Sequence, residues 1–95
     1  MAVIYKYELR DGLQTYNLPD GARILSVAVQ RGVPCMWALV HPQNPDAPRN
    51  IMFTETGIPF DGGPYKFIGT MLTDDHRFVF HVLEEVSPAT PEGSS

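Results

Sequence analysis

The 95-residue sequence predicts an all-β fold, a small antiparallel sandwich or a partly open barrel of six to seven short strands with no significant helix. Apolar and polar residues alternate with a period of two, and turn-forming residues interrupt this pattern about every eight to twelve positions. No stretch of about twelve residues keeps a helical period without a proline or glycine inside it. The expected strands cover residues 2–9, 13–18, 22–30, 33–40, 51–56, 65–72 and 77–84.

The first two expected strands are each followed by turn residues. In residues 2–9, charged side chains alternate with apolar ones, which is typical of a half-buried strand. Asp11-Gly12 favours a turn because both residues tolerate positive φ. Residues 13–18 form a weaker strand that ends at a Pro-Asp-Gly turn, and we expect Tyr16 on this strand to be exposed.

A hairpin is expected in the middle of the sequence. Residues 22–30 form its first strand, and Arg31-Gly32 reverses the chain with the glycine in the left-handed conformation of a tight or bulged turn. Residues 33–40 are apolar on both faces, which predicts a central strand covered from both sides. Pro34 cannot donate a ladder hydrogen bond, so we expect it at the start of this strand or at a bulge.

Alternation also assigns side chains to faces of the sheet. It places Leu25 on the same face as Val27, and Phe67 on the same face as Met71. Proline and glycine mark the segments that we expect to be irregular. These are a stiff loop over residues 41–50, a second loop over residues 57–64 and a polar turn over residues 73–76.

Composition limits the domain organisation and the class of partner. Residues 1–86 are expected to form one β domain, and residues 87–95, which have nothing to bury, a disordered tail. Seven Lys and Arg lie singly along the sequence against eleven Asp and Glu, for a net charge of −4, so we expect no nucleic-acid partner. The single cysteine excludes an internal disulfide and a thiolate-rich zinc site. We recognise no secretion signal and no membrane span, which favours a reducing cytoplasm.

The nucleophilic and titratable residues form no catalytic or metal-binding motif. His76 and His81 are separated by an odd number of residues, so a regular strand would point them to opposite faces. We expect His81 to be a hydrogen-bonded, partly buried imidazole and Cys35 a small core residue. No base is placed near Cys35, and neighbouring carboxylates do not flank a cleft. We therefore expect no enzyme, no cofactor and no metal site.

Binding residues are the better candidates for function. Aromatic side chains in excess at a sheet edge favour interfaces, and Asp74-Asp75 with Glu84-Glu85 could share an acidic patch that binds a basic partner or keeps the fold soluble. The glycines of residues 57–64 could donate backbone N–H groups to a small anionic ligand, although a flexible connection is the simpler interpretation. The candidate binding residues are Tyr16, Trp37, His41, Arg49, Phe60, Asp74, Asp75 and His76.

Four segments carry a resemblance to a known family: Ile4-Tyr5-Lys6-Tyr7-Glu8-Leu9, Gly21-Ala22-Arg23-Ile24-Leu25-Ser26-Val27, Gly32-Val33-Pro34-Cys35-Met36-Trp37 and Tyr65-Lys66-Phe67-Ile68-Gly69-Thr70. In these segments the chain resembles a family of small proteins of unknown function that is common in tailed bacteriophages and prophages. The resemblance implies a phage-encoded protein in the cytoplasm of the host bacterium, accessory to replication or host takeover and acting by stoichiometric binding. It assigns no catalytic residues.

Three hypotheses about function follow. The first is a non-enzymatic binding protein, a homodimer or higher oligomer, that inhibits a host protein or sequesters a small ligand, with an anti-defence role among the options. The second is a virion or assembly component that packs against other phage proteins. The third is a small-molecule enzyme that uses His76, His81 or Cys35.

Overall fold

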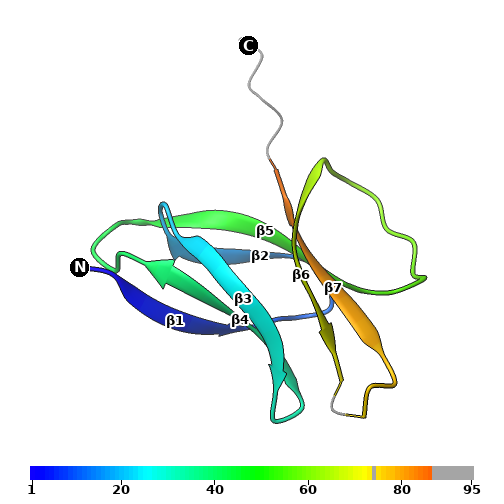
Figure 1. Ribbon diagram of the computed structural model, residues 1–95. Helices are drawn as coiled ribbons and strands as arrows, with labels where there is room; N and C mark the ends of the chain where they lie inside the picture. The colour runs from blue at the N-terminus through cyan, green and yellow to red at the C-terminus, as the bar shows by residue number, and fades with distance from the viewer. Residues whose placement is uncertain (74, 87–95) are drawn as a thin grey trace.

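The computed structural model describes residues 1–73 and 75–86, which form seven antiparallel strands in two sheets and no helix. The predicted all-β class is confirmed, and the arrangement is a sandwich rather than a closed barrel (Figure 1). No helix in this described part is long and apolar enough to cross a membrane. The tail predicted over residues 87–95 lies outside the described residues. The strands are β1 (Val3–Glu8), β2 (Gly12–Pro19), β3 (Arg23–Gln30), β4 (Val33–Val40), β5 (Asp46–Glu55), β6 (Tyr65–Leu72) and β7 (Val79–Glu85).

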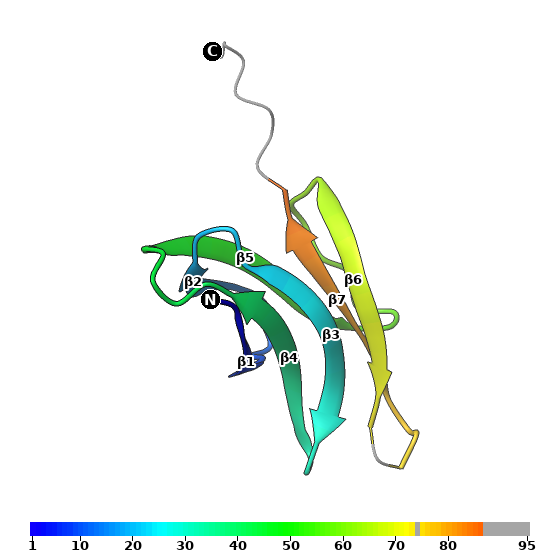
Figure 2. The ribbon, with the colours of Figure 1, turned by 60° about the vertical axis from the view of Figure 1, so that its left-hand side comes forward.

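The two sheets, A and B, have the strand orders β1-β4-β3 and β2-β5-β7-β6. β3 and β4 are joined by Arg31 and Gly32 alone, whose φ angles are 52° and 79°, which confirms the predicted tight hairpin. β4 is the central strand of sheet A, and Pro34 is its second residue, both as predicted. β3 of sheet A packs beside β6 of sheet B, so the sheets meet along one side (Figure 2).

One long connection crosses sheet B. β5 and β6 both run antiparallel to β7, which lies between them, so β5 and β6 are parallel to each other. Residues 56–64, which we call the crossover segment, carry the chain from the end of β5 past β7 to the start of β6 (Figure 1). They contain no strand, which confirms the predicted irregular loop over residues 57–64.

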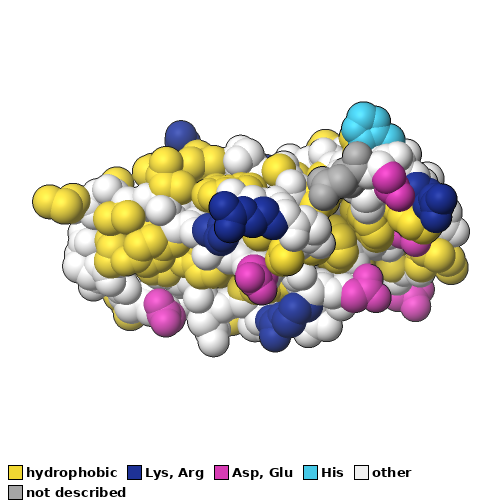
Figure 3. Space-filling model, turned by 90° about the horizontal axis from the view of Figure 1, so that it is seen from below, with side chains coloured by type: hydrophobic (Ala, Val, Ile, Leu, Met, Phe, Trp, Pro, Cys, Tyr) yellow, Lys and Arg dark blue, Asp and Glu magenta, His cyan; other side chains and the backbone are white. Residues whose placement is uncertain are grey.

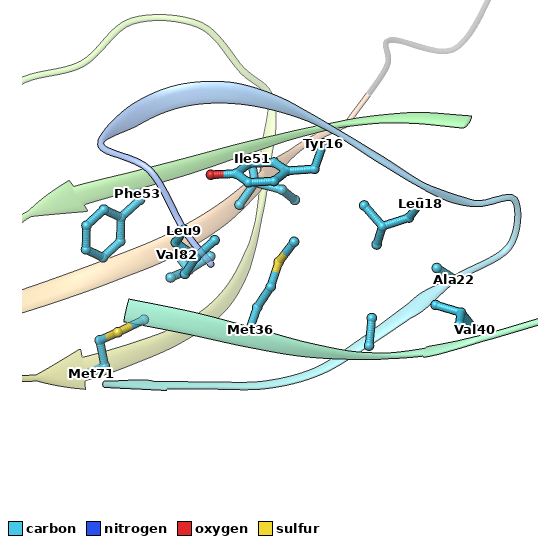
Figure 4. Close-up of a cluster of buried hydrophobic side chains, with 11 residues drawn as sticks. Leu9, Tyr16, Leu18, Ala22, Met36, Val40, Ile51, Phe53, Met71 and Val82 are labelled. Atoms are coloured by element: carbon cyan, nitrogen blue, oxygen red, sulfur yellow. The ribbon is translucent and has the colours of Figure 1, made fainter. Parts of the chain in front are cut away.

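The core lies between the facing sides of the two sheets (Figure 4). The largest fully buried side chains of this core come from β4 of sheet A and from β2, β5 and β7 of sheet B. They are Met36, Val40, Leu18, Ile51 and Val82. Full burial of a side chain of this size stabilises the fold by about 1.5–3 kcal/mol relative to exposure. This small set therefore supplies much of the energy that holds the sheets together.

Tyr16 belongs to this core, so the prediction that it is exposed is wrong. Only 6% of the residue is accessible to solvent. Its hydroxyl accepts the backbone N–H of Arg10 at 2.8 Å, and the Arg10 guanidinium lies 4.9 Å from the centre of the ring. β2 lies opposite sheet A rather than at a free surface, and Tyr16 and Leu18 are both on the side of the strand that faces inward. The weak alternation of apolar and polar residues in this short strand did not indicate that a second sheet packs against it.

A β-bulge changes which side chains of β3 face the core. The pairing register with β4 shifts between Ile24 and Ser26, so Leu25 is an extra residue. Ile24 consequently packs against the core together with Val27, whereas Leu25 is 43% exposed. The expectation that Leu25 shares a face with Val27 is therefore wrong, because a bulge reverses the alternation on one side of it.

A second bulge does the same in β6. The register with β7 shifts between Phe67 and Gly69, which makes Ile68 the extra residue. Met71 is buried in the core, whereas Phe67 points away from it. The predicted common face for Phe67 and Met71 is therefore also wrong.

β5 begins at Asp46, so the loop predicted over residues 41–50 is half as long as expected. Over residues 46–50 this strand pairs only with β2, because its pairing with β7 begins at Ile51. Pro48 therefore needs no hydrogen-bond partner on the β7 side. A proline is tolerated in a strand where one neighbour is missing.

Gly69 allows β6 and β3 to approach each other. A Cβ atom at Gly69 would lie 2.8 Å from Cγ2 of Val27, closer than normal van der Waals contact. Val27 is β-branched, so its side chain cannot easily rotate away. The contact between the two sheets along this side therefore depends on the absence of a side chain at position 69.

Gly69→Ala is expected to lower the free energy of unfolding by about 1–3 kcal/mol, because the added methyl group overpacks against Val27. The double variant Gly69→Ala/Val27→Ala removes the opposing methyl groups and should cost less than the sum of the two single substitutions. Denaturant unfolding of the three variants measures this difference. Strictly additive losses would show that the two residues do not compete for the same space.

Tyr16→Phe is expected to lower the free energy of unfolding by about 1 kcal/mol, because it removes the acceptor of the Arg10 N–H. Tyr5→Phe is the matched control, since Tyr5 is 42% exposed, and it should change stability by less than about 0.5 kcal/mol. Thermal or denaturant unfolding compares the two variants. Equal losses at both positions would contradict the assigned role of the Tyr16 hydroxyl.

Candidate functional site

The candidate binding residues on sheet A lie apart from the others. Trp37 is half-buried on the outer face of β4, where its register partners are Lys6 of β1 and Ser26 of β3. This face is only partly covered, which corrects the expectation that β4 is covered on both sides. His41 follows β4, and its carbonyl accepts the N–H of Asn44 at 2.9 Å in the turn toward β5.

Asp75 and His76 lie in the exposed turn between β6 and β7, and Asp74 lies outside the described residues. Oδ1 of Asp75 accepts the hydroxyl of Thr73 at 2.6 Å and the backbone N–H of Arg77 at 3.0 Å. The bond from Thr73, and then that from Arg77, lowers the pKa of Asp75.

On the side of the molecule that carries the hairpin turns, charged side chains of both signs are spread among hydrophobic and neutral atoms (Figure 3).

The predicted acidic patch is not formed by the carboxylates that the structure describes. Glu84 and Glu85 are the last two residues of β7, whereas Asp75 precedes the first residue of the same strand. The length of β7 therefore separates them. Asp75 lies in the turn that precedes β7, whereas Glu84 and Glu85 lie at the far end of that strand. Residues that belong to one hairpin in the sequence are therefore not neighbours in space here.

The structure instead groups residues around Phe60, on the outer face of sheet B. We call the hollow that they line the crossover hollow, because the crossover segment forms one wall of it. It has a volume of about 260 Å³. Its lining residues are Thr54, Glu55, Thr56, Gly57, Ile58, Phe60, Phe67, His81 and Leu83.

Local geometry holds Phe60 in this position. Its ring packs edge-on against Tyr65, with 5.5 Å between the ring centres. The Tyr65 hydroxyl donates to the carbonyl of Asp61 at 2.6 Å, which ties the crossover segment to the first residue of β6. A Cβ atom at Gly62 would lie 2.6 Å from that hydroxyl, so this arrangement requires glycine there, and the φ of 99° requires it as well.

His81 lies at the side of the crossover hollow with both ring nitrogens engaged. The Thr56 hydroxyl is 3.3 Å from the carbonyl oxygen of Val79, to which it donates, and it lies 2.6 Å from Nε2 of His81. Nδ1 lies 3.1 Å from the Thr70 hydroxyl, and which ring nitrogen donates is set by the tautomer. This geometry confirms the prediction of a hydrogen-bonded, partly buried imidazole.

Arg49 is found on the inner face of sheet B, not in a loop. Its Nε and Nη2 both donate to the carboxylate of Glu84 on β7, and Nη1 donates to the carbonyl of Ala22 at 2.8 Å. The side chains of Arg49 and Glu84 are only 24% and 17% exposed. The hydrogen bond to Glu84 raises the pKa of Arg49, and burial acts against this rise. Arg49 thus joins two strands of sheet B to the residue that precedes β3.

The eight candidate residues therefore do not form one site. Phe60 lines the crossover hollow, and sequence reasoning missed its neighbours Phe67 and Leu83. The signal that could have found the hollow is the pair Ile58 and Phe60, two large apolar residues inside a segment rich in proline and glycine. Among the described residues, no three His, Cys, Asp or Glu side chains gather where they could hold a metal ion. Cys35 is buried, as predicted.

Comparison with known proteins gives a family but no activity. Residues 1–93 match a family described as "Domain of unknown function (DUF7352)". No curated protein matches the chain. No solved structure matches it.

Thr73→Val is expected to raise the pKa of Asp75 toward the ordinary value of an aspartate, because it removes the strongest hydrogen bond to that carboxylate. In the folded wild type the lowered pKa contributes stability that is present above the unfolded-state pKa and is lost as the pH falls through the folded-state pKa. NMR titration of the carboxyl carbon measures the shift, with Thr15→Val as control. An unchanged Asp75 pKa in Thr73→Val would contradict the assignment.

Proposed function

This chain belongs to the DUF7352 family, and we propose that it is a non-enzymatic binding protein that engages a protein partner stoichiometrically through the crossover hollow. The observation that carries the proposal is the set of large apolar side chains exposed around that hollow. Ile58, Phe60 and Phe67 are 54%, 45% and 59% exposed. Apolar side chains that gather around a concavity are typical of contact surfaces, and aromatic residues are enriched there.

The lining of the hollow indicates what the partner presents. Apart from the hydroxyls of Thr54 and Thr56, the carboxylate of Glu55 and the imidazole of His81, the walls are apolar, so the occupant is an apolar side chain. The volume suits one large side chain rather than a whole helix. A fixed wall favours affinity, because Phe60 is held by its packing against Tyr65 and loses little freedom when a partner binds.

Charge around the hollow adds a second requirement. Residues 50–65 of the sequence supply most of the lining of the hollow. The only charged residues in this stretch are Glu55, which lines the hollow, and Asp61, which follows Phe60. Both are acidic, so a basic residue next to the inserted apolar side chain is favoured in the partner. The resemblance to phage proteins makes a protein of the bacterial host the partner to look for, with the bacterial cytoplasm as the place of action.

The test uses a substitution in the hollow and a matched control on the same strand. Phe67→Ser removes the most exposed aromatic wall, and Leu72→Ser removes an apolar side chain that is 49% exposed at the other end of β6. A partner is identified by cross-linking in bacterial cells that express the full chain, and its binding to each purified variant is then measured by calorimetry. We expect a 1:1 complex whose dissociation constant rises at least about thirtyfold in Phe67→Ser and less than about threefold in Leu72→Ser.

The controls make the proposal falsifiable. Both variants should melt close to the wild type, because neither side chain belongs to the core. Equal binding by wild type and Phe67→Ser contradicts the proposal. So does a wild-type chain that only self-associates through this surface, or one that is recovered only as a component of purified virions.

A further inference from the structure

Three of the seven Lys and Arg residues line one hollow at the end of the sandwich where β6 begins. Arg23 comes from β3, Arg49 from β5 and Lys66 from β6. We call this the basic hollow; its volume is about 330 Å³. The other lining residues are Ala22, Ile24, Phe67, Ile68 and Glu84. Basic residues that lie singly along the sequence are therefore brought together by the fold in a protein whose net charge is −4.

The strand register explains how this polar site arises between two sheets. Lys66 pairs directly with Glu84 across β6 and β7, so the two side chains leave the sheet on the same side. Arg49 reaches Glu84 from β5 on that same inner face. The inner face of sheet B is thus apolar along most of its length and charged at this end. Charged side chains on the core-facing side of a sheet are unusual, because inward positions are normally apolar.

The charges inside the basic hollow do not balance. Three cationic side chains and one carboxylate give an excess of two positive charges. Two acceptor positions of the Glu84 carboxylate are taken by the hydrogen bonds that Arg49 donates. Within the described residues, neither Arg23 nor Lys66 has an acidic partner within salt-bridge distance. Two like charges that line one hollow repel each other, and an anion bound between them relieves this repulsion.

Arg49 also keeps hydrogen-bonding capacity. A guanidinium has five N–H groups, and its bonds to Glu84 and to the carbonyl of Ala22 use three of them. The remaining two belong to a side chain that is already held in place by those bonds. Donors that are fixed before a ligand arrives bind it at a lower entropic cost than donors on a free side chain.

The apolar walls of the basic hollow include Ile24 and Ile68, the latter at the bulge of β6. We propose that the basic hollow binds a small organic anion, a carboxylate or a phosphate monoester, whose charged group contacts Arg23, Lys66 and the free N–H groups of Arg49. The apolar body of the ligand lies against the two isoleucines. The basic hollow shares only Phe67 with the crossover hollow, and none of the basic side chains that would contact the anion lines the crossover hollow, so this proposal does not rest on the proposed function.

The test is a titration of the full chain with three probes at constant ionic strength: inorganic phosphate, phenyl phosphate and benzoate. We expect saturable 1:1 binding of at least one organic anion, with amide shifts in NMR spectra centred on residues 22–24, 49, 66–68 and 84. Tighter binding of phenyl phosphate assigns the ligand as a phosphate monoester, and tighter binding of benzoate assigns it as a carboxylate. Both organic anions should bind more tightly than inorganic phosphate, which lacks an apolar body.

Two double variants separate the site from general electrostatic attraction. Arg23→Gln/Lys66→Gln should weaken binding at least about tenfold, and Arg31→Gln/Arg77→Gln, which removes the same charge elsewhere, less than about twofold. The single variant Lys66→Gln repeats the test if the first double variant is poorly folded. Equal weakening in both double variants, or no probe that shifts the amides of the basic hollow, would overturn the proposal. Binding of inorganic phosphate as tight as that of the organic anions would overturn the role of the isoleucines.

Discussion

A single layer of side chains between two sheets holds this protein together. Met36 and Val40 meet Ile51, Leu18 and Val82 across that layer. A chain of this size has no material for a second layer. Most strands give roughly every other residue to the core and leave the rest outside, and β1 contributes only Tyr7. The exposed apolar residues of this molecule are a consequence of that thin construction. These exposed apolar residues differ in one respect: some are enclosed by a neighbouring segment of the chain and others are not.

Irregular segments determine where the enclosure occurs. The bulge at Ile68 rotates Phe67 outward, and the crossover segment brings Phe60 to the same side of sheet B. Without the bulge, Phe67 would share the inward face of β6 with Met71 and the hollow would lose a wall. On the inner face of sheet B, charged residues of β5, β6 and β7 stand where apolar packing would be expected. There the hydrogen bonds of Arg49 to Glu84 and to the carbonyl of Ala22 hold the elements together. Both candidate sites therefore arise where the regular sandwich pattern is broken.

The sequence predicted the regular parts of the fold well. Alternation identified β4 with its bounds, and two residues with positive φ formed the predicted reversal at Arg31-Gly32. Period-two arguments are reliable there because nothing interrupts the ladder between the turns. They fail at Leu25 and Ile68, since one extra residue reverses every assignment beyond it.

The candidate sites were much harder to predict than the strands. Tyr16 lies on a strand whose own pattern is weak, and it is buried because a different sheet covers it. Residues 46–50 pair as a strand in spite of Pro48, because only one neighbour is present there. Arg23, Arg49 and Lys66 meet only through the relative placement of three strands, which local pattern does not encode. Residue type alone identified Phe60 and Arg49, but not their surroundings.

The position of β7 within sheet B has a consequence for synthesis on the ribosome. β7 pairs on one side with β5 and on the other with β6, two strands that are made earlier and that do not touch each other in the ladder. Until residues 79–85 have left the exit tunnel, β6 has no hydrogen-bonded neighbour in its own sheet and the hydrophobic side of β5 is only partly sheltered. Completion of the sheet therefore waits for β7 and depends on contacts between strands that are distant in sequence. Nascent chains that stop short of this strand would present two open strand edges to the cell's proteases and chaperones.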